Sequence, residues 1–319
     1  MDTTMTLATQ SHWTWQIAIY LYLGGMGAAT LSVTFLTDMY LRPHRGLVLW
    51  GAFSGVAMLG VGSLMLFMHL LHHAAVINVL NPLVLFSKPD SWIAWGTQFI
   101  LWMMVWGVLY ALPRARECEK LNTLPVIGWL LDSHLVVSLS GWCGRNCKIV
   151  GWLATVNGIG TAVYTGLVLQ SFPAVALWHN PGVPLLFTVS AFSTAMANLL
   201  LVMNTFMHSE EDRTLRIFYE RIDVILIATE LVILFSFFFF LKSGSESGRK
   251  SLELLSGSPG WVFGFIGLGL VVPFLVELKS VTRGCRSQIP IATASVLVLT
   301  GGYMLRHYFL AAGVYAYPW

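Results

Sequence analysis

Tyrosine, histidine and arginine side chains interrupt the long apolar stretches of this 319-residue sequence. Tyr20 and Tyr164 lie within two of these stretches, His69 lies near the end of a third, and Arg306 lies inside the last. Phenol hydroxyls can hydrogen-bond ring oxygens, and a histidine can accept a proton near neutral pH. An apolar slot with such groups suits a small amphipathic redox molecule such as a quinol.

A second group of ionisable residues is acidic. Asp38, Asp223 and Glu277 lie at the ends of apolar stretches, and Glu230 lies deeper in one. Carboxyl groups buried at successive depths are typical of proton relays in membranes. We therefore predict a proton path through Asp38, Asp223 and Glu230. The alternative is that the three residues at the stretch ends are simply solvated.

The composition indicates which elements must position these groups. Hydrophobic residues make up 56% of the chain and charged residues only 10%, whereas soluble domains have about 25% charged residues. This excludes a soluble enzyme, a disordered chain and a secreted disulfide scaffold. The net charge of +3 is too small to suggest a nucleic-acid partner. The chain is predicted to be an all-α, polytopic membrane protein.

A membrane-spanning helix needs about 20 mainly apolar residues. Eight stretches meet this requirement: Trp15–Thr37, Leu47–Leu71, Ser91–Leu112, Ile149–Ser171, Pro184–His208, Ile222–Leu241, Trp261–Leu278 and Pro290–Gly313. A ninth candidate, Leu124–Trp142, is interrupted by Pro125, Asp132 and His134, so we expect it to lie at the membrane interface. No internal repeat is evident, and the whole chain reads as one domain.

Lysine and arginine are unevenly distributed between the two sets of loops. Thirteen of the eighteen lie in the loops after the odd-numbered spans, which the positive-inside rule places in the cytoplasm. Both termini are then expected on the outer, periplasmic side. The four cysteines, Cys118, Cys143, Cys147 and Cys285, fall on the reducing cytoplasmic side and are expected to be free thiols.

This orientation brings residues from several spans to similar depths near the outer face. Arg306 would lie about 10 Å from the outer end of its helix, and Trp178 and His179 would lie in an outer loop. We predict a binding site formed by Tyr20, His69, Tyr164, Trp178 and Arg306. The competing interpretation is that tyrosine and tryptophan are enriched at membrane interfaces regardless of function, and taken alone Trp178 fits that interpretation better.

Three stretches together resemble the NrfD/PsrC (polysulfide reductase-like) family of integral membrane subunits of respiratory oxidoreductases. They are WTWQIAIYLYLGGMGAAT, YTGLVLQSFPAVALWHNPGVPLLF and GGYMLRHYFLAAG, and the segment RIDVILIATE also fits. The similarity covers essentially residues 1–319 as a single NrfD-like transmembrane domain. It implies a multi-pass protein of a bacterial or archaeal cytoplasmic membrane.

The resemblance also implies a function and partners. Family members react with menaquinone or ubiquinone near the outer face, with no haem or metal in the membrane chain itself. They exchange electrons with a docked [4Fe–4S] ferredoxin-like subunit. That subunit connects to a catalytic subunit, which is a molybdopterin enzyme or a multihaem cytochrome. Proton translocation is a further expectation.

Individual residues take roles from the same resemblance. Tyr164 matches the tyrosine that lies against the quinone ring, and Arg306 matches the arginine of the closing motif. Tyr20 falls at a quinone-facing position, and His69 falls where the family places a polar or ionisable residue. The resulting hypothesis has Tyr164 bonding one ring oxygen and His69 accepting a proton.

Two alternatives remain open on the sequence alone. One is a b-type cytochrome anchor that uses histidines as haem ligands, which need to face each other at matched depth. The candidates are His69, His72, His73, His208 and His307. The other is a proton- or ion-coupled secondary transporter, a class that often shows inverted repeats and broken helices.

Overall fold

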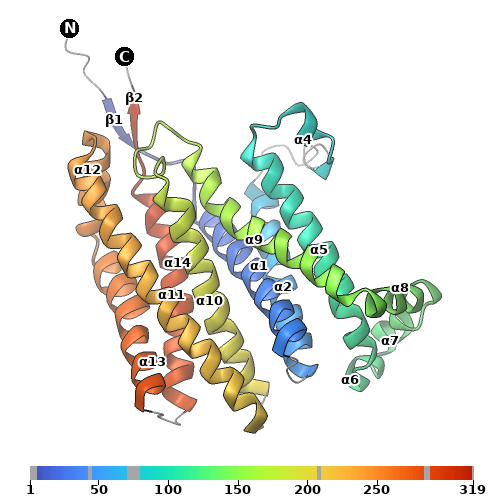
Figure 1. Ribbon diagram of the computed structural model, residues 1–319. Coiled ribbons are helices and arrows are strands. Elements are labelled where there is room, and N and C mark those ends of the chain that lie inside the picture. Colours follow the sequence, from blue (N-terminus) through green and yellow to red (C-terminus); the bar gives the residue numbers. More distant parts are fainter. Residues whose placement is uncertain (1–5, 42–44, 70–79, 207–209, 284–287, 318–319) are drawn as a thin grey trace.

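Eight helices in the described part of the chain are long and apolar enough to cross a membrane. The computed structural model describes residues 6–41, 45–69, 80–206, 210–283 and 288–317. The prediction of an all-α, eight-span protein is therefore confirmed (Figure 1). The spans are α1 (Trp15–Leu41), α2 (Arg45–His69), α5 (Trp92–Arg116), α9 (Cys147–Gln170), α10 (Gly182–Phe206), α11 (Glu210–Ser243), the continuous pair η2 (Gly260–Val271) and α13 (Val272–Arg283), and α14 (Gln288–Ala311).

The spans form two bundles that share a central helix. Helices α1, α2, α5 and α9 pack together as the first bundle, and α10, α11, η2–α13 and α14 pack as the second. Helix α1 also packs against α10 and α14 of the second bundle, which makes it the most buried of the eight spans. Its small residues allow close packing in both bundles: a Cβ on Gly27 would lie 2.8 Å from the carbonyl oxygen of Gly55 in α2, and one on Gly25 would lie 3.3 Å from the Cβ of Ala191 in α10.

Helix α11 is longer than the sequence predicted. The apolar stretch begins at Ile222, but the helix begins at Glu210 and has 34 residues, about 51 Å at 1.5 Å per residue. Its first turns are amphipathic, with Arg213 and Arg221 exposed and Tyr219 buried. The prediction counted only continuous apolar residues, so it missed this extension.

The seventh span begins as the π-helical segment η2 and continues as α13. Glycines of η2 lie against α14. A Cβ on Gly269 would lie 2.7 Å from the Cα of Gly301, so the two backbones touch directly. The span therefore packs through its backbone at this point, which only glycine permits.

Both described chain ends lie at one end of the bundle, which we call the termini end (Figure 1). Strands β1 (Thr6–Thr9) and β2 (Val314–Tyr317) pair antiparallel there, with Thr6 opposite Tyr317. The short helix α4 (Val84–Ser87) and the amphipathic helix α12 (Glu246–Ser256) lie at the same end. Neither the strands nor α12 was expected from the sequence.

The opposite end carries α6 (Glu119–Asn122), α7 (Pro125–Leu131) and α8 (His134–Arg145). Helices α7 and α8 correspond to the ninth candidate and are bent by 64° relative to each other. With 7 and 12 residues, neither helix alone reaches across a hydrocarbon layer about 30 Å thick. Together the two helices are apolar enough for one broken span, so their interfacial location stays a prediction. Cys118, Cys143 and Cys147 are free thiols, and Cys285 lies outside the described residues.

Candidate functional site

Two predicted site residues meet between the first and fourth spans. The Tyr20 hydroxyl on α1 donates a hydrogen bond of 3.1 Å to the Tyr164 hydroxyl on α9. Both side chains are buried, with 4% and 3% of their surface exposed. A tyrosine hydroxyl can donate once and accept twice. In this arrangement the Tyr164 O–H proton can therefore donate to a third group, such as an oxygen of a ligand.

The ring of Tyr164 rests on a glycine of a third helix. A Cβ added to Gly96 of α5 would lie only 2.1 Å from Cε2 and Cζ of Tyr164. Any side chain at position 96 would thus occupy the space of the tyrosine ring. Gly96 was not expected at the site, because a glycine in an apolar helix usually indicates only close helix packing.

His69 lies beside the first turn of α1. Its Nδ1 is 3.3 Å from the side-chain oxygen of Gln16, which lies one helical turn before Tyr20 on the same face. Helix α2 runs close to α1 here, since a Cβ on Gly62 would lie 3.5 Å from the Tyr20 carbonyl oxygen. The polar face of α1 therefore continues from the tyrosine pair to His69 through Gln16, a residue that sequence reasoning missed.

The other histidines considered in the sequence lie outside the described residues or make contacts away from the tyrosine pair. His72, His73 and His208 lie outside the described residues. His307 stacks on Tyr303 of its own helix, with ring centroids 5.8 Å apart. His179 is exposed, and its Nδ1 lies 2.6 Å from the carbonyl oxygen of Gln170. None of these contacts brings His179 or His307 to the tyrosine pair.

Arg306 is fully buried in the second bundle. Its guanidinium donates hydrogen bonds to the Ser190 hydroxyl at 2.7 Å and to the carbonyl oxygens of Gly302 at 2.9 Å and Phe187 at 3.1 Å. It also lies over the ring of Tyr22, 5.9 Å from the centroid. Residues two positions apart on a helix point about 200° apart. Arg306 therefore faces the Tyr22 side of α1, away from Tyr20.

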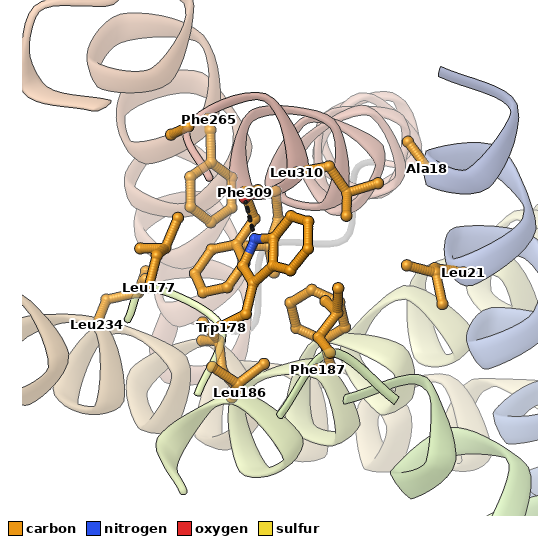
Figure 2. Packing of buried hydrophobic residues seen from close by; sticks show 14 of the residues in the cluster. Ala18, Leu21, Leu177, Trp178, Leu186, Phe187, Leu234, Phe265, Phe309 and Leu310 are labelled. Carbon is orange, nitrogen blue, oxygen red and sulfur yellow. Dashed lines mark hydrogen bonds between the residues drawn. The ribbon is translucent and has the colours of Figure 1, made fainter. Parts of the chain in front are cut away.

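Trp178 lies in the core and not in an interfacial belt (Figure 2). Its side chain has no exposed surface, and its indole nitrogen donates a 3.0 Å hydrogen bond to the carbonyl oxygen of Phe309. Trp13 and Phe172 pack against its ring system, at centroid distances of 5.2 and 6.1 Å. The indole N–H is thus already engaged, and the structure gives Trp178 a packing role that closes the termini end of the second bundle.

Among the described residues, four carboxyl groups are buried in the second bundle. Glu220, Asp223 and Glu230 lie at 2%, 0% and 1% exposure on one face of α11, and Glu277 of α13 has no exposed surface. The alternative that Asp223 and Glu277 are solvated at the ends of their spans is therefore wrong. Glu220 was missed because it precedes the apolar stretch from which the sixth span was predicted.

Two of these four acids, which together we call the acid network, accept hydrogen bonds from hydroxyl groups. Ser193 donates to Asp223 at 2.6 Å, and Ser280 donates to Glu220 at 2.8 Å. Among the described residues, both carboxyl oxygens of Glu277 and one each of Asp223 and Glu230 are buried without a hydrogen-bond partner. A carboxylate ion that lacks a hydrogen-bond partner is costly to bury, and adding a proton removes its charge. The group can therefore hold protons inside the membrane-spanning region.

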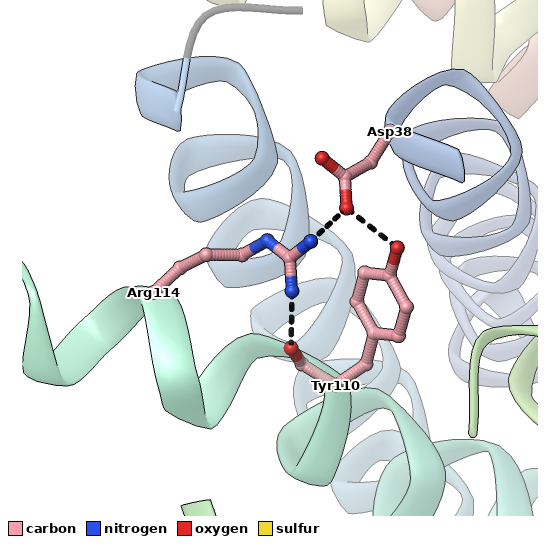
Figure 3. A network of polar contacts seen from close by, with 3 residues as sticks. All are labelled: Asp38, Tyr110 and Arg114. Atoms are coloured by element: carbon pink, nitrogen blue, oxygen red, sulfur yellow. Dashed lines mark hydrogen bonds and ion pairs between the residues drawn. The ribbon is translucent and has the colours of Figure 1, made fainter. Parts of the chain in front are cut away.

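Asp38 belongs to a different polar cluster (Figure 3). Its carboxylate forms an ion pair with Arg114 and accepts a 2.5 Å hydrogen bond from the Tyr110 hydroxyl, both on α5. The side chains of Arg114 and Asp38 are 21% and 13% exposed. These contacts join α1 to α5 within the first bundle. The structure therefore does not bring Asp38 together with Asp223 and Glu230.

These features define a multi-pass membrane protein of two four-helix bundles, with a buried tyrosine pair in one and an acid network in the other. A family model described as "Polysulphide reductase, NrfD" matches residues 4–318. The chain belongs to this NrfD/polysulfide reductase family, as the sequence resemblance predicted.

Individual relatives cover the chain along almost its full length. Protein NrfD of Escherichia coli is 28% identical over 317 residues, with 94% of each chain covered. A polysulfide reductase chain of Wolinella succinogenes is 25% identical over 319 residues, again with 94% of each covered. A selenate reductase subunit of Mesobacillus selenatarsenatis is 20% identical over 336 residues, covering 98% of this chain and 76% of that protein.

Proposed function

We propose that this chain is the quinone-reactive membrane subunit of a respiratory reductase complex. In this role it exchanges electrons between the membrane quinone pool and a partner subunit that carries [4Fe–4S] clusters. The family and the reductase subunits among its relatives support a place in such a complex. The observation that carries the quinone assignment is the buried Tyr20–Tyr164 hydroxyl pair. It packs on Gly96, and His69 contacts Gln16 on the same face of α1 as Tyr20.

The proposed orientation places the termini end on the periplasmic side. The excess of lysine and arginine in the loops at the opposite end favours this orientation. The polar face from Tyr20 to Gln16 then opens toward the outer face, where the partner subunit would dock beside the strands and α12. A catalytic subunit, a molybdopterin enzyme or a multihaem cytochrome, would receive the electrons through that partner.

The proposed chemistry is acid–base assistance of a two-electron reaction. Quinol oxidation releases two electrons and two protons and leaves a quinone; the reverse reaction consumes them. The Tyr164 hydroxyl would donate to one ring oxygen, and His69 would accept a proton from a ring hydroxyl. Tyr20 would hold the Tyr164 hydroxyl in place. Arg306 and Trp178 would act at a distance, by fixing α10 and α14.

We further propose that the acid network of the second bundle passes protons during turnover. Glu230, Asp223, Glu277 and Glu220 are buried at successive levels, and Glu220 and Glu230 are ten residues apart on α11, about 15 Å along its axis. Asp38 is left out of this path because Arg114 neutralises it in the other bundle. A Glu230→Gln variant should lower the number of protons moved per electron in liposomes while electron transfer continues.

The quinone proposal is tested on the complex purified from native membranes in mild detergent. We expect a co-purifying subunit with cysteine-rich ferredoxin repeats, together with bound quinone. In that complex Tyr164→Phe and His69→Ala should slow quinol-linked turnover, whereas Tyr40→Phe, at an exposed tyrosine on the same α1, should not. A chain that purifies alone, without quinone, would refute the proposal and favour the transporter interpretation. A b-type haem band in a reduced-minus-oxidised spectrum would favour the cytochrome interpretation.

A further inference from the structure

We propose that Gln16 is a positioning residue, which holds the imidazole of His69 so that its Nε2 faces the quinone site as a proton acceptor. The inference rests on the proposed quinone function, but it concerns a residue that the family resemblance did not assign. Its basis is a short polar chain at the start of α1, formed by Thr14, Gln16 and His69.

The side-chain oxygen of Gln16 meets two possible donors. His69 Nδ1 lies 3.3 Å from it, and the Thr14 hydroxyl donates to the same oxygen, also at 3.3 Å. Thr14 itself is fixed by the first turn of the helix, because its carbonyl oxygen accepts from the amides of Ile17 and Ala18. The oxygen is therefore held in place by α1, the most buried of the eight spans.

An amide oxygen can only accept a hydrogen bond, so the group facing it must donate. This contact places the proton of a neutral imidazole on Nδ1 and leaves the lone pair on Nε2. It also restrains a ring that would otherwise rotate about two side-chain bonds at the end of α2. A carbonyl that fixes the tautomer of a reactive histidine in this way has the same effect as the outer-shell partners of metal-binding histidines.

The position of Gln16 connects this restraint to the tyrosine pair. Gln16 and Tyr20 are four residues apart and share one face of α1, so His69 is held on the face that carries Tyr20. In the step we propose, an O–H bond of the quinol breaks and an N–H bond forms at Nε2. The imidazole gains a positive charge, which strengthens its Nδ1–H bond to Gln16, and the ring oxygen gains the negative charge.

The test uses two variants of Gln16 in the purified complex. Gln16→Met keeps the length of the side chain but removes the acceptor. Gln16→Glu keeps an acceptor at the same position. We expect Gln16→Met to lower kcat for quinol oxidation by about tenfold or more with KM nearly unchanged, and Gln16→Glu to retain most of the activity. A packing role alone predicts the reverse order, since methionine suits an apolar contact and a carboxylate does not.

Parallel measurements separate this inference from the quinone proposal. If His69→Ala slows turnover but Gln16→Met does not, the positioning role is overturned and the quinone site stands. If neither variant has an effect although quinol still reacts, His69 is not the proton acceptor and the inference falls with it. Should Gln16→Met fail to assemble, Thr14→Val removes the supporting donor instead, and a kcat equal to that of the wild type would then overturn the inference.

Discussion

Replacing Gly96 with alanine would displace the ring of Tyr164 without removing any atom of the tyrosine. The variant therefore tests whether the position of this ring matters for the reaction with quinol. The added Cβ would lie 2.1 Å from the ring atoms Cε2 and Cζ, whereas carbon atoms in contact are normally about 3.5–4.0 Å apart. The ring or one of the helices α5 and α9 must therefore move by more than about 1 Å. A shift of that size disturbs the 3.1 Å hydrogen bond between Tyr20 and Tyr164.

The expected magnitude follows from two effects. Overpacking a filled contact costs about 1–3 kcal/mol, and the gain in helix propensity on replacing glycine with alanine offsets about 0.5–1 kcal/mol of it. The complex should thus still assemble, with a lower melting temperature. Because a displacement of about 1 Å in a positioned group can cost roughly a hundredfold in rate, we expect kcat/KM for quinol to fall by about 10- to 100-fold.

The assay is quinol-dependent turnover of the purified complex, with Gly60→Ala in α2 as the matched control. No atom of the described residues would meet a Cβ at Gly60 within 4 Å, so that variant should behave as wild type. A double variant with Tyr164→Phe separates the ring from its hydroxyl. If Gly96→Ala acts by displacing the Tyr164 hydroxyl, it should lower kcat/KM little further in a protein that already carries Tyr164→Phe. Wild-type kcat/KM in Gly96→Ala, or the full loss repeated on top of Tyr164→Phe, would refute the reasoning.

Three further substitutions test whether Arg306, Asp38 and Trp178 contribute to stability or to the reaction with quinol. Arg306→Gln removes the hydrogen bonds of a buried guanidinium to Ser190, Gly302 and Phe187 and should destabilise the complex by about 1–3 kcal/mol. Thermal unfolding in detergent would show this loss, and an unchanged melting temperature would contradict it. Asp38→Asn breaks a partly exposed ion pair and should cost about 1–3 kcal/mol without changing quinol turnover, so slower turnover would return Asp38 to the proton path. Trp178→Phe leaves the Phe309 carbonyl without its indole donor and should lower stability at constant KM for quinol, whereas a raised KM would place the indole at the quinone.

Much of the fold could be predicted from the sequence because the membrane restricts the choice of structure. Backbone groups in lipid must bond within their own segment, so long apolar stretches must be helices. The same restriction explains why Tyr20 and Tyr164 could be matched by depth before any contact was known. Composition and hydropathy say little about segments at the ends of the bundle, so the paired strands and α12 were not foreseen.

The sequence could not indicate which faces of neighbouring helices meet. Depth placed Arg306 level with the tyrosines, but depth does not say which face of α1 a neighbouring helix meets. Tyr20 and Tyr22 point to opposite sides of that helix, and Arg306 lies over Tyr22. In the same way, Gly96 became part of the site only once α5 was packed against Tyr164. A glycine that makes room for a ring has no pattern in sequence that distinguishes it from one at an ordinary helix crossing.

The position of α1 bears directly on the two proposals. One face of this helix carries Gln16 and Tyr20, and the other carries Tyr22, whose hydroxyl donates to the Leu299 carbonyl at 2.8 Å beneath Arg306. Arg306 in turn donates to the Ser190 hydroxyl on α10, the helix that also carries Ser193, the donor to Asp223 of the acid network. The proposed quinone site and proton path thus lie on either side of one buried, glycine-rich helix. If electron transfer drives proton movement, α1 offers a physical route for the coupling, because it carries Tyr20 on one face and, on the other, Tyr22 in contact with Arg306.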